Sequence, residues 1–346
     1  MAARKISLIG GGSFGTVIAN IAAESGCEVN FWMRSDDLVA DVNQYHENTQ
    51  YLPGYALSTA VVATNDMKAA VEHSELIFVA VPSTSFRSVV KQLVQYAAPQ
   101  VTLVSTTKGV EAGTFMLMSQ ILTEEAPEAR VGVLSGPNLA KEITKKQLTG
   151  TVIASNDEKV REAVKSVLSS KYFRVYTNDD MFGVELGGSL KNIYAIIAGI
   201  AAAIGMGHNT NSMLVTRSLT EMARFGRELG ADPMTFLGLA GVGDLIVTCS
   251  TPLSRNYRMG FALGKGKSLE EALAEIGQVV EGVNTVKLVK DKADELGVYM
   301  PLANGLFQII YNNDSINNII SSLMLNEEAL DVEFAANDEK KLSYKE

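Results

Sequence analysis

Three closely spaced glycines near the start of the chain could hold a phosphate-bearing cofactor. Gly10, Gly12 and Gly15 follow the apolar segment Ile6–Ile9 and precede a helical pattern, which gives the order strand, G-x-G-x-x-G, helix. The first glycine permits a tight turn, the second lets a pyrophosphate approach the backbone, and the third lets the helix pack close to the strand. The free N–H groups at the helix start attract phosphate charge. The motif predicts a dinucleotide site formed by Gly10, Gly12, Ser13, Phe14 and Gly15.

The end of the second apolar segment bears on the choice between NAD and NADP. A site that favours NAD has a carboxylate there, which holds the ribose 2′-OH. The segment Glu28–Trp32 has no carboxylate at its tip, and Arg34 stands where a 2′-phosphate would lie. This pattern favours NADPH, although a solvated surface arginine is the alternative. Asp36 and Asp37 are close enough in sequence to leave use of both coenzymes open.

Three polar or glycine-bearing turns follow further apolar segments. They are Pro82–Thr84, Thr106–Gly109 and Gly136–Ala140. Open parallel sheets bind ligands at the carboxyl ends of their strands, so these turns predict one shared binding site. Each turn taken alone could be ordinary turn chemistry. Lys108 could hold a substrate oxygen or phosphate, with a solvated lysine as the alternative.

The elements that must position these residues alternate between strand and helix in the first half of the chain. Short, nearly all-apolar strands between helices indicate a mostly parallel sheet covered on both faces. The predicted strands are Lys5–Ile9, Glu28–Trp32, Leu76–Val81, Val101–Ser105, Arg130–Ser135, Thr151–Ala154 and Phe173–Tyr176. The predicted helices between them include Thr16–Ser25, Phe86–Ala97 and Glu158–Ser169.

The second half of the chain is expected to be all helical. Apolar residues recur at helical spacing from Val215 to Leu229, and Asp232-Pro233 reads as an N-cap before a further helix. Other helical patterns cover Leu269–Ile276, Thr285–Leu296 and Asn304–Ile310. We therefore expect an α/β fold: a Rossmann-type domain at residues 1–184, then an all-α domain at 185–334, as in 6-phosphogluconate dehydrogenase. Residues 335–346 are expected to be a disordered tail.

Composition narrows the class of protein. The chain has 346 residues, of which 47% are hydrophobic, and this is enough for two domains with substantial cores. The net charge of −9 argues against a general nucleic-acid or membrane-surface binder. Two cysteines and three histidines without metal-ligand spacing indicate a metal-free enzyme of the cytoplasm. The start of the chain does not resemble a signal peptide, and the apolar run Ile193–Met206 is shorter than the roughly 20 residues that span a bilayer.

Taken together, the motifs resemble the NAD(P)-dependent glycerol-3-phosphate dehydrogenases of the bacterial soluble type. The resemblance spans nearly the whole chain, from Ile6 to about Leu325. It rests on the order of several motifs. They are Gly10–Gly15, Thr106–Gly109, Ser135–Glu142, Leu190-Lys191-Asn192, Gly241–Leu245, Ser254-Arg255-Asn256 and Val280-Glu281-Gly282.

The resemblance implies a catalytic group of Lys191, Asp244 and Lys108. Lys191 would exchange a proton with the C2 oxygen of the substrate, and an apolar helix after it would lower its pKa by desolvation. Lys108 nearby would act in the same direction. Asp244 would favour the charged form of Lys191, and Thr248 would add a hydroxyl. Without the family, a snorkelling surface lysine and a helix-capping aspartate are the simpler interpretations.

The resemblance also implies the binding residues. Arg255 and Asn256 match the Arg-Asn pair of the family, and the planar guanidinium suits a phosphate dianion. Asn138 stands where the family usually has serine or threonine, so the geometry of that contact is in question. The implied substrate contacts are Lys108, Gly136, Asn138, Lys191, Asp244, Thr248, Ser254, Arg255 and Asn256. The implied coenzyme contacts outside the glycine motif are Arg34, Lys108, Ala140, Arg255, Val279 and Glu281.

The implied activity is the reversible NAD(P)H-dependent reduction of dihydroxyacetone phosphate to sn-glycerol 3-phosphate, which supplies glycerophospholipid synthesis. NADPH is the expected coenzyme, and a homodimer without membrane insertion is the expected state. One alternative is a related β-hydroxyacid dehydrogenase, which would need a carboxylate-recognising site. The other is a dinucleotide-binding sensor without catalysis, which would be expected to lack Lys191 or Asp244.

Overall fold

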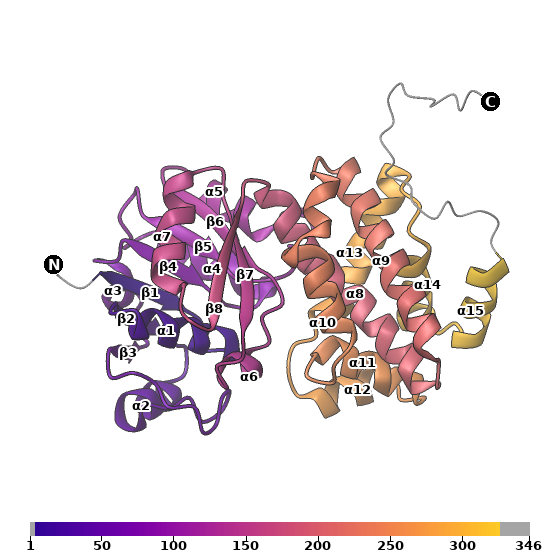
Figure 1. Cartoon of the computed structure of the whole chain (residues 1–346), viewed down its shortest axis with the longest axis horizontal. Coiled ribbons are helices and arrows are strands. Elements are labelled where there is room, and N and C mark those ends of the chain that lie inside the picture. The colour runs from indigo at the N-terminus through magenta and orange to yellow at the C-terminus, as the bar shows by residue number, and fades with distance from the viewer. Residues whose placement is uncertain (1–3, 326–346) are drawn as a thin grey trace.

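The computed structural model describes residues 4–325, and its two halves differ in architecture (Figure 1). The first half is a sheet of eight strands: β1 (Lys5–Ile9), β2 (Glu28–Trp32), β3 (Val61–Thr64), β4 (Leu76–Val79), β5 (Thr102–Ser105), β6 (Arg130–Ser135), β7 (Thr149–Ala154) and β8 (Phe173–Asn178). Its helices are α1 (Ser13–Glu24), α2 (Asp36–Tyr45), α3 (Met67–Val71), α4 (Ser83–Leu93), α5 (Met118–Glu125), α6 (Ala140–Ile143) and α7 (Glu158–Leu168).

The order of the strands places the glycine motif at a ligand-binding position. The sheet runs β3-β2-β1-β4-β5-β6-β7-β8, and neighbouring strands are parallel except for the antiparallel pair β6 and β7. The order reverses between β1 and β4, so the turns after these two strands lead away to opposite faces of the sheet. Ligands of open α/β sheets bind at this switch point, outside the carboxyl ends of the strands.

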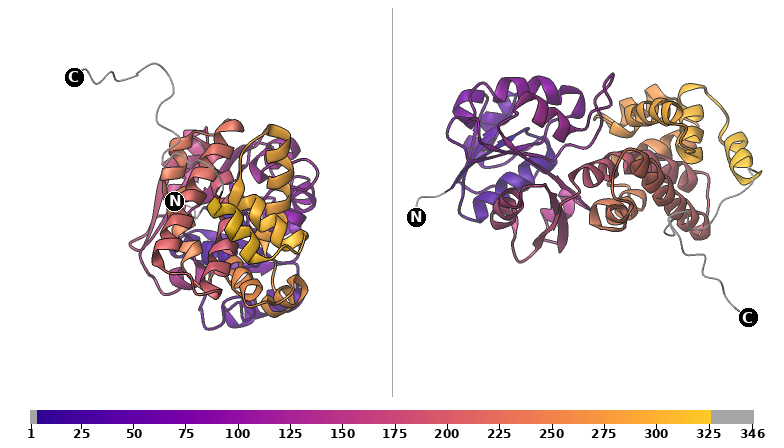
Figure 2. Two further views of the ribbon diagram at one scale, coloured as in Figure 1. Left: turned by 90° about the vertical axis from the view of Figure 1, so that its right-hand side faces the viewer. Right: turned by 90° about the horizontal axis from the view of Figure 1, so that it is seen from above.

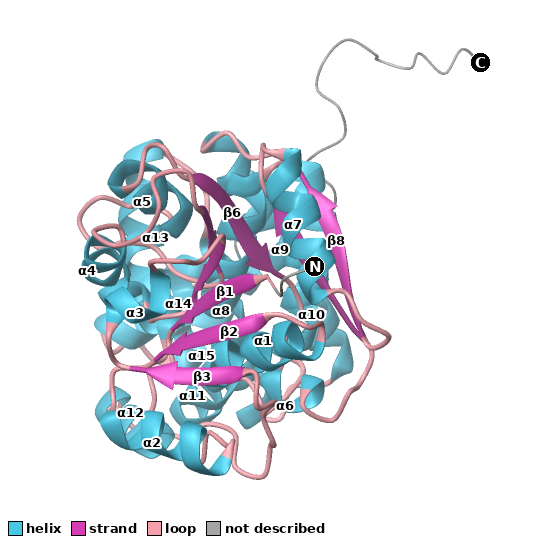
Figure 3. Ribbon diagram, turned by 90° about the vertical axis from the view of Figure 1, so that its left-hand side faces the viewer, coloured by secondary structure: helices cyan, strands magenta, loops and turns pink. Residues whose placement is uncertain are grey.

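Helices cover both faces of the sheet, which confirms the predicted mostly parallel, doubly covered architecture (Figure 3). One apolar layer joins the strands to α3, α4 and α5, and the other joins them to α1, α2, α6 and α7. The strands β4 and β5 are buried over their whole length. Such strands read as continuous apolar runs because neither face meets water.

Two elements differ from the sequence predictions. β3 (Val61–Thr64) was not predicted, because it is a four-residue edge strand in which buried and exposed residues alternate. The segment after Asp232 was predicted to open an α-helix. Asp232 does cap it by accepting from Met234 N at 2.9 Å, but it forms a 3₁₀ turn, η1 (Pro233–Leu237), and then a π turn, η2 (Leu239–Gly243).

The second half is all helical, as predicted. Its helices pack on or around one long helix, α8 (Met181–Ala203), directly or through a neighbouring helix. The others are α9 (His208–Glu228), α10 (Asp244–Cys249), α11 (Arg255–Gly264), α12 (Leu269–Ile276), α13 (Glu281–Leu296), α14 (Pro301–Tyr311) and α15 (Ile316–Leu325). Figure 2 shows α15 at the outer end of this half.

Helix α8 is the core of the helical half. It packs against α9, α10, α11, α13 and α14. By length and composition it could cross a membrane, yet 89% of its most apolar window is buried inside the fold. Gly260 on α11 explains part of this burial, since a Cβ there would lie 1.8 Å from the Ile196 carbonyl oxygen. The burial marks α8 as the core helix of a folded domain.

The predicted domain boundary at residue 184 falls in the first turn of α8, and that boundary stays a prediction. The predicted tail at residues 335–346 lies outside the described residues.

Candidate active site

The glycine turn after β1 has the shape that a pyrophosphate needs. Gly10 has a φ of +123°, and a Cβ there would lie 2.5 Å from the Ala80 carbonyl oxygen. A Cβ at Gly15 would lie 2.2 Å from the Gly10 carbonyl oxygen, whereas one at Gly12 would meet no atom within 4 Å. Only the middle glycine therefore faces open space, at the N-cap of α1. These residues fit a dinucleotide coenzyme.

The turn is supported from below by a residue that the sequence did not single out. Asn48 is fully buried, and its Nδ2 donates to Gly11 O at 2.9 Å and to Thr16 Oγ1 at 2.8 Å. Ser13 Oγ donates to Tyr51 O at 3.2 Å, and Phe14 is half-buried against the core. Asn48 lies in the irregular stretch between α2 and β3, where no motif marks it.

Arg34 lies beside the glycine turn. It is exposed and lies two residues after the carboxyl end of β2, whose Trp32 O accepts from Gly10 N at 3.0 Å. Asp36 begins α2, and its carboxylate accepts a hydrogen bond from Asn65. The cation thus stands at the strand end, while the nearest carboxylate is engaged by a neighbouring loop. This arrangement suits a 2′-phosphate.

One buried carboxylate joins two lysines at the carboxyl ends of β5 and β6. Lys191 Nζ donates to Asp244 Oδ1, and it also donates to Thr248 Oγ1 at 2.7 Å. Lys108 Nζ donates to Asp244 Oδ2 at 2.5 Å and to Gly136 O at 3.3 Å. The side chain of Asp244 is only 1% exposed, so water screens these charges poorly. Two cations around one anion leave a net positive charge.

Burial lowers the pKa of Lys191 well below its ordinary value, and the positive charge of Lys108 acts in the same direction. Asp244 opposes both effects by favouring the charged form of the lysine. A lysine with a lowered pKa gives up its proton more readily than a solvated lysine.

The fold places Asp244 through an irregular helix. A Cβ at Gly241 would lie 2.1 Å from the Phe236 carbonyl oxygen, so only glycine allows η1 and η2 to pack this closely. The π turn η2 leads directly into α10, whose first residue is Asp244. Thr248 lies one turn later and donates to Asp244 O at 2.6 Å. π turns are rare and are often found at functional sites.

The amino end of α11 is joined to the segment that carries Lys191. Ser254 caps this helix by accepting from Tyr257 N at 3.2 Å, and Arg255 and Asn256 form its first turn. Asn256 Nδ2 donates to Asn192 Oδ1 at 2.9 Å, and Asn192 directly follows Lys191. A helix amino end with an arginine is a favourable place for a phosphate dianion. Asn256 uses its amide to join two helices, which the sequence did not indicate.

A contact between the two halves of the chain lies next to this helix end. Arg255 Nη1 donates to the carbonyl oxygen of the partly exposed Val279 at 2.9 Å. Glu281 begins α13 and accepts from Ser83 Oγ at 2.7 Å, at the start of α4 in the sheet half. Burial raises the pKa of Glu281. The predicted coenzyme residues of the helical half therefore reach the turn after β4.

The turn after β6 contains the departure from the family pattern. Asn138 Nδ2 donates to Thr151 Oγ1 at 2.9 Å, while its Oδ1 is buried and has no partner among the described residues. Gly136 has a φ of +140° and presents its carbonyl oxygen to Lys108. Ala140 is the first residue of α6 and is partly exposed. The NH₂ group of Asn138 is thus bound to β7.

The structure brings most of the predicted site residues to the carboxyl edge of the sheet. Hydrogen bonds join five of them into one group: Lys108, Asp244, Lys191, Thr248 and Gly136. The Asn192–Asn256 bond links the first turn of α11 to the helix of Lys191, whereas the Arg255 guanidinium donates to Val279 O. Sequence reasoning gave no role to Asn48, Ser83, Glu185, Ser189 or Asn192. Glu185 had a signal, since it is a carboxylate between apolar residues in a glycine-rich segment.

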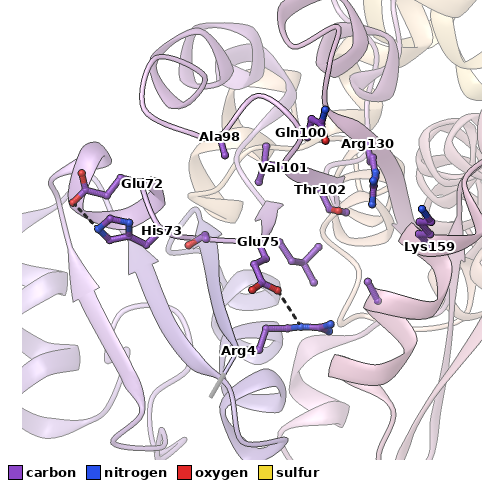
Figure 4. A pocket seen from close by; sticks show the side chains of 13 residues that line it. Arg4, Glu72, His73, Glu75, Ala98, Gln100, Val101, Thr102, Arg130 and Lys159 are labelled. Carbon is purple, nitrogen blue, oxygen red and sulfur yellow. Dashed lines mark ion pairs between the residues drawn. The ribbon is translucent and has the colours of Figure 1, made fainter. Parts of the chain in front are cut away.

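A cavity of about 600 Å³ lies at the opposite, amino edge of the sheet (Figure 4). Its charged lining includes Arg4, Glu75, Arg130 and Lys159. Arg4 pairs with Glu75 at 3.6 Å, and Arg130 pairs with Asp157 at the same distance. Among residues 4–325, no group of three or more His, Cys, Asp or Glu side chains is placed to hold a metal ion.

Comparisons with known proteins agree with this geometry. The family model described as NAD-dependent glycerol-3-phosphate dehydrogenase N-terminus matches residues 5–161, and the corresponding C-terminus model matches residues 180–321. The glycerol-3-phosphate dehydrogenase [NAD(P)+] of Saccharophagus degradans is 53% identical over 95% of this chain and 92% of its own. That of Pseudomonas putida is 55% identical over 95% and 96%.

A solved structure adds a likeness in three dimensions. The glycerol-3-phosphate dehydrogenase of Coxiella burnetii has a TM-score of 0.90 and 34% identity, and the match covers 94% of this chain and 99% of that one. Both halves of the chain and nearly its whole length are therefore matched. As the sequence resemblance predicted, the chain belongs to the NAD-dependent glycerol-3-phosphate dehydrogenase family.

Proposed function

We propose that the chain catalyses the reversible NAD(P)H-dependent reduction of dihydroxyacetone phosphate to sn-glycerol 3-phosphate, which supplies glycerophospholipid synthesis. One observation carries the proposal: Lys191 and Lys108 share the buried carboxylate of Asp244 at the carboxyl edge of the sheet. The glycine turn lies at the same edge, and so does the arginine-bearing end of α11. A phosphorylated ketone needs these three features together.

The two lysines are suited to different tasks. When bound, the nicotinamide coenzyme supplies a hydride to C2 of the ketone. Lys191 Nζ then donates its proton to the C2 oxygen, which leaves the alcohol and a neutral lysine. Lys108 adds a second positive charge near that oxygen, where negative charge develops. Asp244 holds both ammonium groups in place and keeps Lys191 charged before the reaction.

Arg255 and the amino end of α11 are proposed to bind the phosphate. Charge-assisted bonds from a guanidinium are strong and directional, so phosphate binding can orient the carbonyl for reaction. The Asn192–Asn256 bond sets the distance between this phosphate site and Lys191. The substrate thus bridges two helices that the protein already holds together.

The coenzyme is proposed to be NADPH in preference to NADH. Arg34 is exposed at the end of β2, and the Asp36 carboxylate is engaged by Asn65. The relatives are named for both coenzymes, so use of NADH at lower efficiency is expected.

The two alternative functions fit less well. A β-hydroxyacid dehydrogenase would need a site for a carboxylate, whereas the relatives that match almost the whole chain are named for glycerol 3-phosphate. A sensor without catalysis would not need the lysine pair around Asp244.

We further propose a cytoplasmic homodimer without membrane insertion, with a division into domains near residue 184. The two unpaired, buried cysteines support a reducing compartment, and the acidic net charge speaks against binding to a membrane surface. The helical half exposes apolar side chains, including Met213 on α9 and Leu325 on α15, which a second copy could cover. Sedimentation at several protein concentrations would test the dimer.

The test of the activity follows oxidation of NADPH and NADH by absorbance with dihydroxyacetone phosphate, unphosphorylated dihydroxyacetone and a panel of keto acids. We expect rapid turnover of the phosphorylated ketone alone. Turnover of a keto acid but not of the ketone phosphate would replace the proposal with the hydroxyacid alternative. Coenzyme binding without any turnover would support the sensor.

A further inference from the structure

The loop that carries Lys108 belongs to the sheet half by sequence but packs on the helical half. This Lys108 loop, residues 106–117, connects β5 to α5. Val110 and Leu117 are buried in the apolar core of the helical half. Phe115 meets Phe225 of α9 edge to face, with ring centroids 6.0 Å apart. Apolar contacts therefore hold the middle of the loop against the helices.

Two residues one turn apart on α8 hold the two ends of the same loop. Ser189 Oγ accepts from Gly109 N at 2.9 Å, immediately after Lys108. Glu185 accepts from Ser119 N at 3.1 Å and from Ser119 Oγ, just beyond the far end of the loop. Both residues of α8 are buried. The same helix carries Lys191. One helix therefore holds Lys191 directly and holds Lys108 through the loop.

Glu185 replaces a missing helix cap. α5 begins after Leu117, whose side chain has no hydrogen-bond acceptor for the first-turn N–H groups. The carboxylate of Glu185 supplies that acceptor from another part of the fold and places negative charge at the positive end of the helix. Burial raises the pKa of Glu185 to about 7, and the hydrogen bonds from Ser119 oppose that rise. The hydrogen bonds from Ser119 and from the Met118 N–H thus favour the charged carboxylate.

We propose that Glu185 is a positioning residue for the reaction: by capping α5 it fixes the Lys108 loop to α8, which keeps Lys108 and Lys191 on the two oxygens of Asp244. The inference rests on the proposed function, because the consequence is measured in turnover. Glu185 contacts neither lysine in the described hydrogen bonds, so its effect passes through the loop.

The chain offers a matched control in Glu221 on α9. It is also a buried carboxylate whose pKa burial raises to about 7. It also caps a helix without a cap of its own, since it accepts from Leu302 N at 2.6 Å at the start of α14. Its described hydrogen bonds go to Tyr194, Leu302 and Ala303 in the helical half, and none of them reaches the Lys108 loop. Glu221→Gln therefore reproduces the loss of a remote cap without the loss of the loop contact.

The experiment is a double-mutant cycle between Glu185→Gln and Lys108→Ala, measured as kcat/KM for dihydroxyacetone phosphate. We expect Glu185→Gln to lower kcat/KM about tenfold in the wild-type background and less than about twofold when Lys108 is absent, as for coupled residues. Glu221→Gln should have the same effect in both backgrounds. An equal loss from Glu185→Gln in both backgrounds, or no loss at all, would overturn the proposal.

A milder variant and a second measurement allow the proposal to be tested even if Glu185→Gln does not fold. If Glu185→Gln does not fold, Ser119→Ala removes only the hydroxyl donor, and the same cycle with Lys108→Ala then decides in the same way. Amide hydrogen exchange in peptides covering residues 106–117 should be faster in Glu185→Gln than in Glu221→Gln. Equal exchange in the two variants would contradict the proposed role of Glu185. Absence of turnover in the wild type would instead contradict only the proposed function, and the exchange measurement would still test the contact between Glu185 and the loop.

Discussion

Charged residues lie at both edges of the sheet, but the two edges arrange them differently. At the amino edge, Arg4 pairs with Glu75 at 3.6 Å (Figure 4) and Arg130 pairs with Asp157 at the same distance. All four side chains are exposed. At the carboxyl edge, two lysines share one carboxylate, Asp244, whose side chain is 1% exposed.

The comparison shows that burial and an unequal charge count distinguish the two edges. Exposed pairs matched one to one are worth little, because water already solvates both partners. A buried group with one cation in excess is electrostatically costly, and a negative ligand or a developing oxyanion relieves that cost. The cavity at the amino edge is open space without such an imbalance.

Removal of Lys191 should cause the largest loss of activity among the changes at the carboxyl edge of the sheet. We expect Lys191→Ala to lower kcat by about 10³-fold, within the range of a positioned proton donor. Steady-state oxidation of NADPH with dihydroxyacetone phosphate measures it. Lys290→Ala, which removes a half-buried lysine paired with the exposed Asp294 on α13, is the control for the loss of a lysine outside the site. A loss of similar size in both variants would argue against a special role for Lys191.

Removal of Arg255 should distinguish binding of the substrate phosphate from reduction of its carbonyl group. Arg255→Ala should lower kcat/KM for the phosphorylated ketone by about 10²-fold, the value of a charge-assisted contact. The slow reaction of unphosphorylated dihydroxyacetone should change little, because that substrate has no phosphate to lose. Equal losses on both substrates would mean that Arg255 acts on the coenzyme or the fold instead.

The pH dependence of the reduction rate should reflect the two positive charges around Asp244. Burial and Lys108 lower the pKa of Lys191 from its ordinary value of 10.5, so the reduction rate should fall with rising pH well before that value. Above the lowered pKa the lysine has lost the proton that it must donate.

The neighbouring residues should move this alkaline decline in opposite directions. Lys108→Ala removes a charge that lowers the pKa of Lys191, so the decline should move to higher pH. Asp244→Asn removes a charge that raises it, so the decline should move to lower pH. Profiles that shift the same way in both variants would refute the assignment of the decline to Lys191.

Arg34 should have a smaller and more selective effect. Arg34→Ala should reduce the preference for NADPH over NADH about tenfold, as expected for the loss of one ionic contact to a 2′-phosphate. The kcat/KM for NADH is the internal control and should stay nearly constant. A parallel loss with both coenzymes would show that Arg34 does not read the 2′ position.

The smallest effect is expected at the amino edge. Arg130→Ala breaks an exposed pair and should change the free energy of unfolding by about 0.5 kcal/mol or less. Thermal unfolding and the NADPH assay together measure this. A marked loss of activity would mean that the two edges are coupled through the sheet, and the comparison would fail.

The central strands β4 and β5 could be predicted from the sequence because they are buried on both faces and read as short apolar runs. β1, β2 and β6 have the predicted bounds. β3 was missed because an edge strand buries only alternate residues. The 3₁₀ and π turns before Asp244 were missed because close packing against Phe236 decides them, and local propensity does not.

The sequence by itself determined the glycine turn, the order of the motifs and the family, because these depend on residue types at fixed spacing. Only the tertiary structure decided which charges share a partner. Lys108, Lys191 and Asp244 lie far apart in the chain, and burial around Asp244 brings them into one group. The same holds for Glu185, whose role as the cap of α5 requires two helices that the sequence alone cannot place side by side. Electrostatic coupling depends on distance and solvent exposure, and both come from packing.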